Sequence, residues 1–317
     1  MNRPVPASSM MLPPPAVPGW ASPREHVPDT ADAAFMAGAA LYALDQLVRS
    51  APPWAGAWRQ RLALRCAASA CRLSGRSEEE AALRDAWHLR KGDEDPGPGG
   101  NVFGAFRQLA TRAPEIDAAG LALVVEKLGL RWDDAFGDLP EDFDAAVRNG
   151  PAAPFAAAAM MRQVTEVAPS AEPLAWWLGD LMLAAKMRWP RPVPLLMSRA
   201  FSPAFRAENG RGKRLKPGEE GFSRALMIGA AEAAADACRL AADIARRAER
   251  LQAVSPKLRA KGAGEAIRRL LDDDAVPGTL ATKALSRFAS RRLFERLTGF
   301  DAVQELSGRS SFRLYGL

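Results

Sequence analysis

The chain has 317 residues, a length that suggests about two domains of ordinary size. Hydrophobic residues make up 48% and charged residues 25%, a balance that excludes a wholly disordered or fibrous chain. Mean hydropathy is −0.16 and no uncharged apolar stretch is long enough to cross a bilayer, so we expect no membrane association. Three cysteines, an odd number, are typical of a reducing compartment, and we expect a cytoplasmic protein.

The net charge of +6 is unevenly distributed. The last 73 residues contain 15 Lys or Arg and 8 Asp or Glu, whereas the first 244 contain 28 and 29. A compositional bias toward arginine would act on both parts and does not explain this difference. A segregated basic end indicates a surface that binds a polyanion such as nucleic acid.

Most of the chain has the pattern of amphipathic helices. Residues 1–30 contain eight prolines and no continuous apolar segment, which favours a flexible lead over a signal peptide. Beyond them, apolar residues recur at three- and four-residue steps, the helical period. Helices are expected at about 30–50, 54–74, 102–112, 117–129, 139–149, 153–167, 171–188 and 221–254, with a shorter one near 194–205.

Local signals refine this all-α body, which we place at residues 31–254. Ser77 and Glu80 have the spacing of a capping box and predict that a further helix begins there. The Gly, Pro and Asp content of Lys91–Asn101 predicts a loop. The prolines of WPRPVP exclude a helix at 189–194. Strand-like alternation is absent before residue 300.

Residues 255–317 have a different pattern. Three short helices are expected in GEAIRRLLDDD, TLATKAL and LSRFASRRLFERLTGF, with a turn at Pro277-Gly278. Two β-rich runs, AVQEL and SFRLYGL, follow and are joined by SGRS as in a hairpin. This order is that of a winged helix–turn–helix. The expected fold class is therefore mainly α: a multi-helix bundle with a C-terminal winged helix–turn–helix ending in a β-hairpin.

The third of these helices carries the predicted DNA contacts. In a DNA-binding winged helix, one face of this helix docks on the module and the other enters the major groove. Arg can pair with guanine, Ser can bond phosphate or base edges, and basic linker residues add phosphate contacts. The predicted contact residues are Ser286, Arg287, Ser290 and Arg291 on the helix, Arg309 at the hairpin tip, and Lys257, Arg259 and Lys261 in the linker.

Signs of enzyme chemistry are weak. Cys66 and Cys71 are five residues apart and diverge on a helix, so we expect packed thiols and no metal site. The usual nucleophile and phosphate-binding motifs are absent, and we expect no enzyme and no cofactor. The run Asp272–Asp274 is interpreted as a solvated helix end, and His88 lacks an evident acid–base partner. Trp87, Trp176, Trp177 and Trp189 are more typical of a core than of a ligand cage.

Several stretches resemble a bacterial family named domain of unknown function 1403. They are PPWAGAWRQRLALR, EEEAALRDAWHLR, GDEDPGPGGN, RWPRPVPLL, SPKLRAKGAG and RRLFERL…AVQELSGRSSFRLYGL, and they extend from about Ala33 to the C-terminus. The resemblance implies that body and C-terminal module form one unit, and it implies no catalytic residues. It also implies a glycine before the final Ala-Val, where this chain has Asp301, and hence an altered turn into the wing.

These observations predict a protein that binds double-stranded DNA through residues 255–317. It would be a transcription regulator or a replication or maintenance factor of mobile DNA, with a body that forms homo-oligomers or binds a protein partner. Two alternatives remain open. The winged helix can serve protein–protein interaction on a helical scaffold, or an enzyme site can be assembled across the body.

Overall fold

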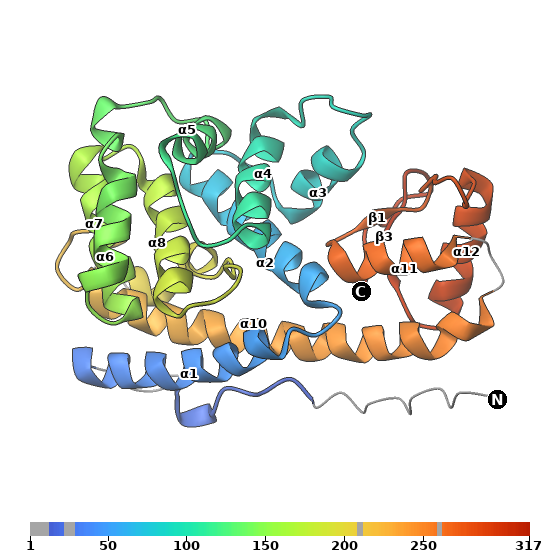
Figure 1. Ribbon diagram of the computed structural model, residues 1–317, viewed down its shortest axis with the longest axis horizontal. Helices are drawn as coiled ribbons and strands as arrows, with labels where there is room; N and C mark the ends of the chain where they lie inside the picture. Colours follow the sequence, from blue (N-terminus) through green and yellow to red (C-terminus); the bar gives the residue numbers. More distant parts are fainter. Residues whose placement is uncertain (1–12, 22–28, 208–211, 259–261) are drawn as a thin grey trace.

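The computed structural model describes residues 13–21, 29–207, 212–258 and 262–317 and is mainly helical (Figure 1). Its α-helices are α1 (Thr30–Ser50), α2 (Ala55–Leu73), α3 (Glu80–His88), α4 (Gly97–Thr111), α5 (Ala118–Lys127), α6 (Leu139–Asn149), α7 (Ala153–Val167), α8 (Glu172–Lys186), α10 (Phe222–Val254), α11 (Ala263–Asp272) and α12 (Arg287–Gly299). Short 3₁₀ helices are η1 (Gly19–Ala21), η2 (Asp134–Phe136), η3 (Leu196–Arg199), η4 (Pro203–Phe205) and η5 (Ser255–Lys257). Within the described ranges, no helix combines the length and apolarity that a bilayer crossing requires.

The longest helix, α10, connects the two ends of the molecule (Figure 1). Its 33 residues extend for about 50 Å, and α1 packs along it on the outer side. Alanines dominate the buried face of α10, and small side chains allow the two helix axes to approach closely. Helices α2 to α8 lie over the N-terminal part of α10, and residues 262–317 lie over its C-terminal part.

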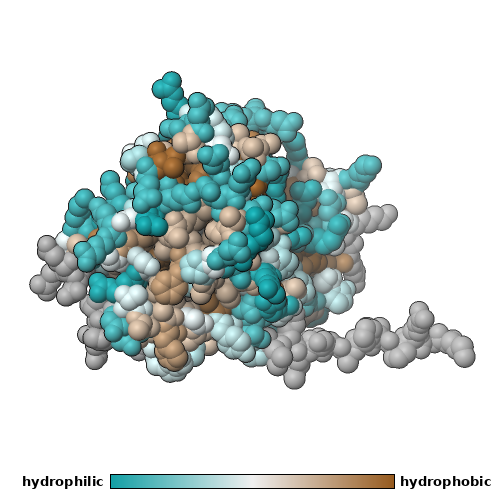
Figure 2. Space-filling model, turned by 60° about the vertical axis from the view of Figure 1, so that its left-hand side comes forward, coloured by the Kyte–Doolittle hydropathy of each residue, from teal (hydrophilic) through white to brown (hydrophobic). Residues whose placement is uncertain are grey.

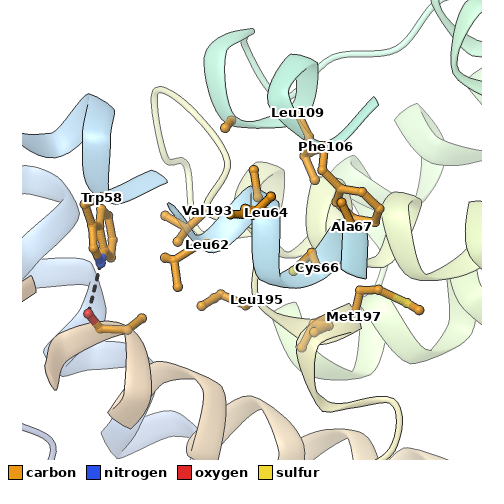
Figure 3. Packing of buried hydrophobic residues seen from close by; sticks show 14 of the residues in the cluster. Trp58, Leu62, Leu64, Cys66, Ala67, Phe106, Leu109, Val193, Leu195 and Met197 are labelled. Carbon is orange, nitrogen blue, oxygen red and sulfur yellow. Dashed lines mark hydrogen bonds between the residues drawn. The ribbon is translucent and has the colours of Figure 1, made fainter. Parts of the chain in front are cut away.

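Helix α2 lies at the centre of the body and packs against α4, η3 and α10 (Figure 3). Leu62, Leu64 and Cys66 lie among side chains of α4 and of the segment that includes Val193 and Met197. The indole nitrogen of Trp58 donates to the carbonyl of Ala237 in α10 at 2.9 Å, so the buried polar atom is satisfied. Trp176, Trp177 and Trp189 are also buried in the core, as expected.

The predicted helices of the body are confirmed, with differences at three points. Helix α3 begins at Glu80 and the residue before it makes no side-chain cap, so the capping box predicted at Ser77 is wrong. Helix α4 begins at Gly97, because Pro98 fits the first turn. Backbone N–H groups in the first turn have no acceptor within the helix, so the N–H that proline lacks costs no hydrogen bond there. The loop predicted to Asn101 is therefore too long. The short helix expected near 194–205 is instead the pair η3 and η4.

A small three-stranded sheet lies at the C-terminal end. Its strands are β1 (Val276–Pro277), β2 (Gln304–Glu305) and β3 (Leu314–Gly316), in the antiparallel order β1-β3-β2. The expected hairpin is thus present. Strand β1 was not predicted, because two residues are too few to show the alternation of apolar and polar residues that indicates a strand. The helix predicted over TLATKAL is wrong, since residues 279–286 form turns and bends.

The apolar core is continuous across the molecule. One cluster of buried side chains contains Leu44 and Trp58 from the body together with Leu270, Phe294 and Tyr315 from the C-terminal unit. The C-terminal unit therefore shares one hydrophobic core with the body.

The surface at the opposite end of the molecule, near α6 and α7, is mostly polar, with an apolar band running down its middle (Figure 2).

Candidate functional site

Helix α12 begins as the sequence predicts. The Ser286 hydroxyl accepts from the backbone N–H of Ala289 at 3.2 Å, a standard N-cap that satisfies one free donor of the first turn. Leu293, Phe294 and Leu297 are buried, and the Phe294 ring stacks on Tyr315 of β3 with ring centroids 4.7 Å apart. These contacts fix the orientation of α12 on the sheet.

The opposite face of α12 is basic and exposed. Arg287 and Arg291 lie at its N-terminal end, as predicted, and their side chains face solvent. Arg292 packs over the ring of Phe288 at 4.4 Å and Arg296 over that of Phe300 at 5.6 Å. None of these four arginines forms an ion pair with any residue that the structure describes. In Figure 1, α12 lies at the far edge of the molecule from α6 and α7.

The prediction that Ser290 contacts DNA is wrong. Its side chain is completely buried, and its hydroxyl has no hydrogen-bond partner among the described atoms. The reason is helical geometry: Ser290, Leu293 and Leu297 are three and seven residues apart and therefore share one face. Ser290 contributes to packing and is not available to DNA, and this spacing could have revealed it from the sequence.

The other predicted contact residues lie in different surroundings. Arg309 forms an ion pair with Asp85 of α3, so the tip of the β2–β3 connection contacts the body. Lys257 is exposed in η5. Arg259 and Lys261 lie outside the described residues. Asp301, where the resemblance implies a glycine, has φ +53, in the left-handed region that glycine favours, and pairs with Arg250 of α10.

A buried cluster of charges joins the C-terminal unit to the body. Asp274, expected to be solvated, has no exposed surface and accepts from the Nε atoms of Arg61 and Arg84, the latter at 2.6 Å. Burial disfavours its charged form, but the two guanidinium groups outweigh this and hold the pKa of Asp274 well below its ordinary value. Arg61 also donates to the carbonyl of Leu317 at 3.3 Å, which holds the end of the chain.

The neighbouring Asp273 extends this cluster. It accepts two bonds from Arg107 of α4, at 2.6 and 3.0 Å, a bidentate geometry that fixes both side chains. His88 Nε2 lies 3.8 Å from the same carboxylate without a hydrogen bond. Burial lowers the pKa of His88, although Asp273 opposes the shift. The predicted solvated helix end is thus wrong: sequence reasoning missed that the acids that follow α11 contact arginines of α2, α3 and α4.

The cysteines are packing residues, as predicted. Cys66, Cys71 and Cys238 are buried and form no disulfide. Burial raises the pKa of Cys71 and Cys238 to about 11 and that of Cys66 well above its usual value, which makes the reactive thiolate scarce. No group of three potential metal ligands occurs in the part of the chain that the structure describes.

A cavity in the body is lined by residues of α2, α3, η3 and α10 and has a volume of about 860 Å³. Some of its charged groups are paired with one another. Arg76 forms an ion pair with Glu78, and Arg199 forms one with Asp236. Arg65, Arg72, Glu79 and Glu80 line the same cavity and form no ion pair among the described residues, so the cavity contains unpaired charges of both signs.

Comparison with known proteins locates the chain in a family. A search of curated proteins found no match. The family model described as "protein of unknown function (DUF1403)" matches residues 6–317, which is nearly the whole chain and includes both the body and the C-terminal unit. On that match, the chain belongs to the DUF1403 family.

Proposed function

We propose that residues 262–317 form a winged helix and that the protein binds double-stranded DNA through the outer face of α12. The order α11, β1, α12, β2, β3 and the sheet order β1-β3-β2 support a winged arrangement. The segment 279–286 departs from the helix–turn–helix pattern because it contains turns in place of a helix. Docking of α12 by its apolar face leaves its basic face free for a groove.

One observation carries the proposal: four arginines on α12 are exposed and have no ion pair among the described residues. Elsewhere, exposed arginines occur both with a carboxylate partner, as Arg239 and Arg246 do on α10, and without one among the described residues, as Arg131 and Arg148 do; α12 differs in carrying four of the latter kind on one helix. Unpaired guanidinium groups on one helix face can release counterions from phosphates and form bidentate bonds with guanine. Arg287 and Arg291 would contact base edges, and Ser286 at the helix N-terminus would contact a phosphate.

The test is the affinity of the full-length protein for a duplex, measured by fluorescence anisotropy at several salt concentrations. Arg287→Ala combined with Arg291→Ala should weaken binding about tenfold or more and reduce the salt slope by roughly two charges. The matched control is Arg239→Ala with Arg246→Ala, which removes the same charge from exposed positions on α10 and should leave affinity unchanged. Equal losses in both double variants would mean non-specific attraction and would contradict the role of α12.

A second candidate function is protein–protein interaction through the same helix. Phe288 is 64% exposed and Phe300 39% exposed, and aromatic side chains of this kind are common in protein interfaces. If the second copy of the chain is the partner, Phe288→Asp should abolish self-association in sedimentation velocity. Binding of this type would change little with salt, whereas duplex binding would weaken steeply.

A further inference from the structure

A groove lies between α12 and the connection from β2 to β3. Its volume is about 320 Å³, at the lower end of the range for small-ligand sites. One wall is α12, which contributes Arg291 and Glu295, and the other wall is the β2–β3 connection with Ser310, Ser311 and Phe312. Arg291 therefore belongs both to this groove and to the basic face of α12.

The floor of the groove is rigid. Tyr315 is 4% exposed and stacks on Phe294, so its ring cannot move without disturbing the core. A side chain at Gly278 would bring its Cβ within 2.8 Å of the Tyr315 ring, so only glycine fits beside it. The groove is thus formed before any ligand arrives, which lowers the entropic cost of binding.

Phe312 is the unusual residue of this groove. Its ring is 70% exposed, and it stacks on no other aromatic ring in the described chain. Its φ is +54, a left-handed conformation that is unfavourable for a bulky side chain. A backbone held in this conformation, with a large apolar ring in solvent, is a feature often found at ligand-binding sites.

The charges of the groove identify what fits. Three charged side chains line the groove. Arg291 has no ion pair within the described ranges and can bind a phosphate, and Arg313, which lies 3.6 Å from Glu305, adds positive charge beside it. Glu295, on the next turn of α12, would repel a phosphate. Glu295 instead suits the amino groups of a base, and the Ser310 and Ser311 hydroxyls can bond either base edges or the sugar. A ligand with a flat aromatic part, amino groups and one phosphate satisfies all of these groups.

We infer that this groove binds an unpaired nucleotide of the bound DNA, with its base on Phe312, its amino groups toward Glu295 and its phosphate on Arg291. The inference rests on the proposed function and extends it, because it makes the protein a reader of junctions between double- and single-stranded DNA. Stacking on an aromatic ring tolerates any base, so the preference concerns structure and not sequence.

The test compares two probes that differ only at one end. One is a blunt duplex, and the other is the same duplex with about five unpaired nucleotides on each strand, forming a fork. The full-length protein should bind the fork about fivefold or more tightly, as expected for one stacked base. Phe312→Ala should abolish this preference without changing affinity for the blunt duplex, and Phe312→Tyr should retain it because the ring is kept.

The control variant is Tyr42→Ala, which removes an aromatic ring of similar exposure, 66%, from α1. It should behave as the wild type, and circular dichroism should show that all variants are folded. Equal affinity of the wild type for both probes would overturn this inference and leave the proposed function intact, as would a fork preference that survives in Phe312→Ala. Failure to bind either probe would overturn both.

Discussion

The charged side chains on the two sides of the C-terminal unit differ in whether they have ion-pair partners. Toward the body, Asp273 and Asp274 meet Arg61, Arg84 and Arg107, and each carboxylate is bound by guanidinium donors. Away from the body, the arginines of α12 face solvent without carboxylate partners among the described residues. On the first side the unit supplies the carboxylates and the body supplies the arginines, whereas on the second side the arginines belong to the unit itself.

This difference separates charges that hold the fold together from charges available to a ligand. A buried carboxylate is tolerated only when its lost hydration is replaced, so the cluster at Asp274 has to be complete. An exposed arginine contributes little to folding in either direction. Four of them along the exposed side of one helix are explained more readily by something outside the chain. The following variants test this division, from the largest expected effect on stability to the smallest.

Asp274→Asn should destabilise the protein most. The variant leaves Arg61 and Arg84 partly buried without a counter-charge, a change that costs roughly 3–5 kcal/mol. The free energy of unfolding from urea titrations measures it. Asp272→Asn, at the exposed residue two positions earlier, is the control and should be nearly neutral. A neutral Asp274→Asn would break the comparison, because the cluster would then contribute nothing to folding.

The same residue should give the wild type a defined response to acid. The pKa of Asp274 is lower in the folded than in the unfolded state, so its contribution is complete above the unfolded value, about 4. It is lost as the pH falls below that value. The difference in unfolding free energy between wild type and Asp274→Asn should therefore be constant from pH 5 to 7 and shrink below about pH 4. A difference that grows in acid would contradict the depressed pKa.

Gly56→Ala tests the backbone contact beside the charge cluster. An added Cβ at Gly56 would lie 2.6 Å from the Cα of Asp272, so α2 and α11 would have to separate. We expect a loss of roughly 1–3 kcal/mol. Gly38→Ala is the matched control, since nothing lies within 4 Å of that position on α1, and it should gain up to about 1 kcal/mol. Thermal melting of both variants distinguishes these opposite signs.

Ser290→Ala should have a small effect on stability. It tests whether the buried face of α12 takes part in DNA binding. The buried hydroxyl has no partner among the described atoms, so its removal should change stability by less than about 1 kcal/mol. Duplex affinity should be unchanged, in contrast to Arg291→Ala on the exposed side of the helix. A selective loss of DNA binding in Ser290→Ala would mean that this face opens on binding.

Arg309→Ala should have the smallest effect on stability. The ion pair with Asp85 is partly exposed, with side-chain exposures of 43% and 31%, and such pairs contribute little because solvent screens them. Unfolding free energy should change by less than about 0.5 kcal/mol. Salt-dependent anisotropy then shows whether the hairpin tip contacts DNA: an unchanged salt slope assigns Arg309 to the body, and a reduced slope restores its predicted role.

Helix boundaries and the faces of helices were accessible from the sequence. Asp29 caps α1, the prolines before residue 195 end the helical pattern, and Ser286 caps α12, all through interactions within a few residues. Ser290 could have been placed correctly by the same local periodicity. The hairpin was predictable because β2 and β3 are close in sequence. The missed features include β1, whose strand partner is about forty residues away, the Gly97 start of α4 and the irregular segment that replaces the helix predicted over TLATKAL.

The amino-acid sequence by itself determined a mainly helical chain, its cationic C-terminal end and the amphipathic character of α12, because these properties depend on residue types at short spacing. Only the tertiary structure decided that Asp274 is buried against Arg61 and Arg84, that Arg309 leans on α3, and that Phe312 faces a groove beside Arg291. Each of these depends on segments brought together by folding, and charge alone does not reveal which partner a side chain meets.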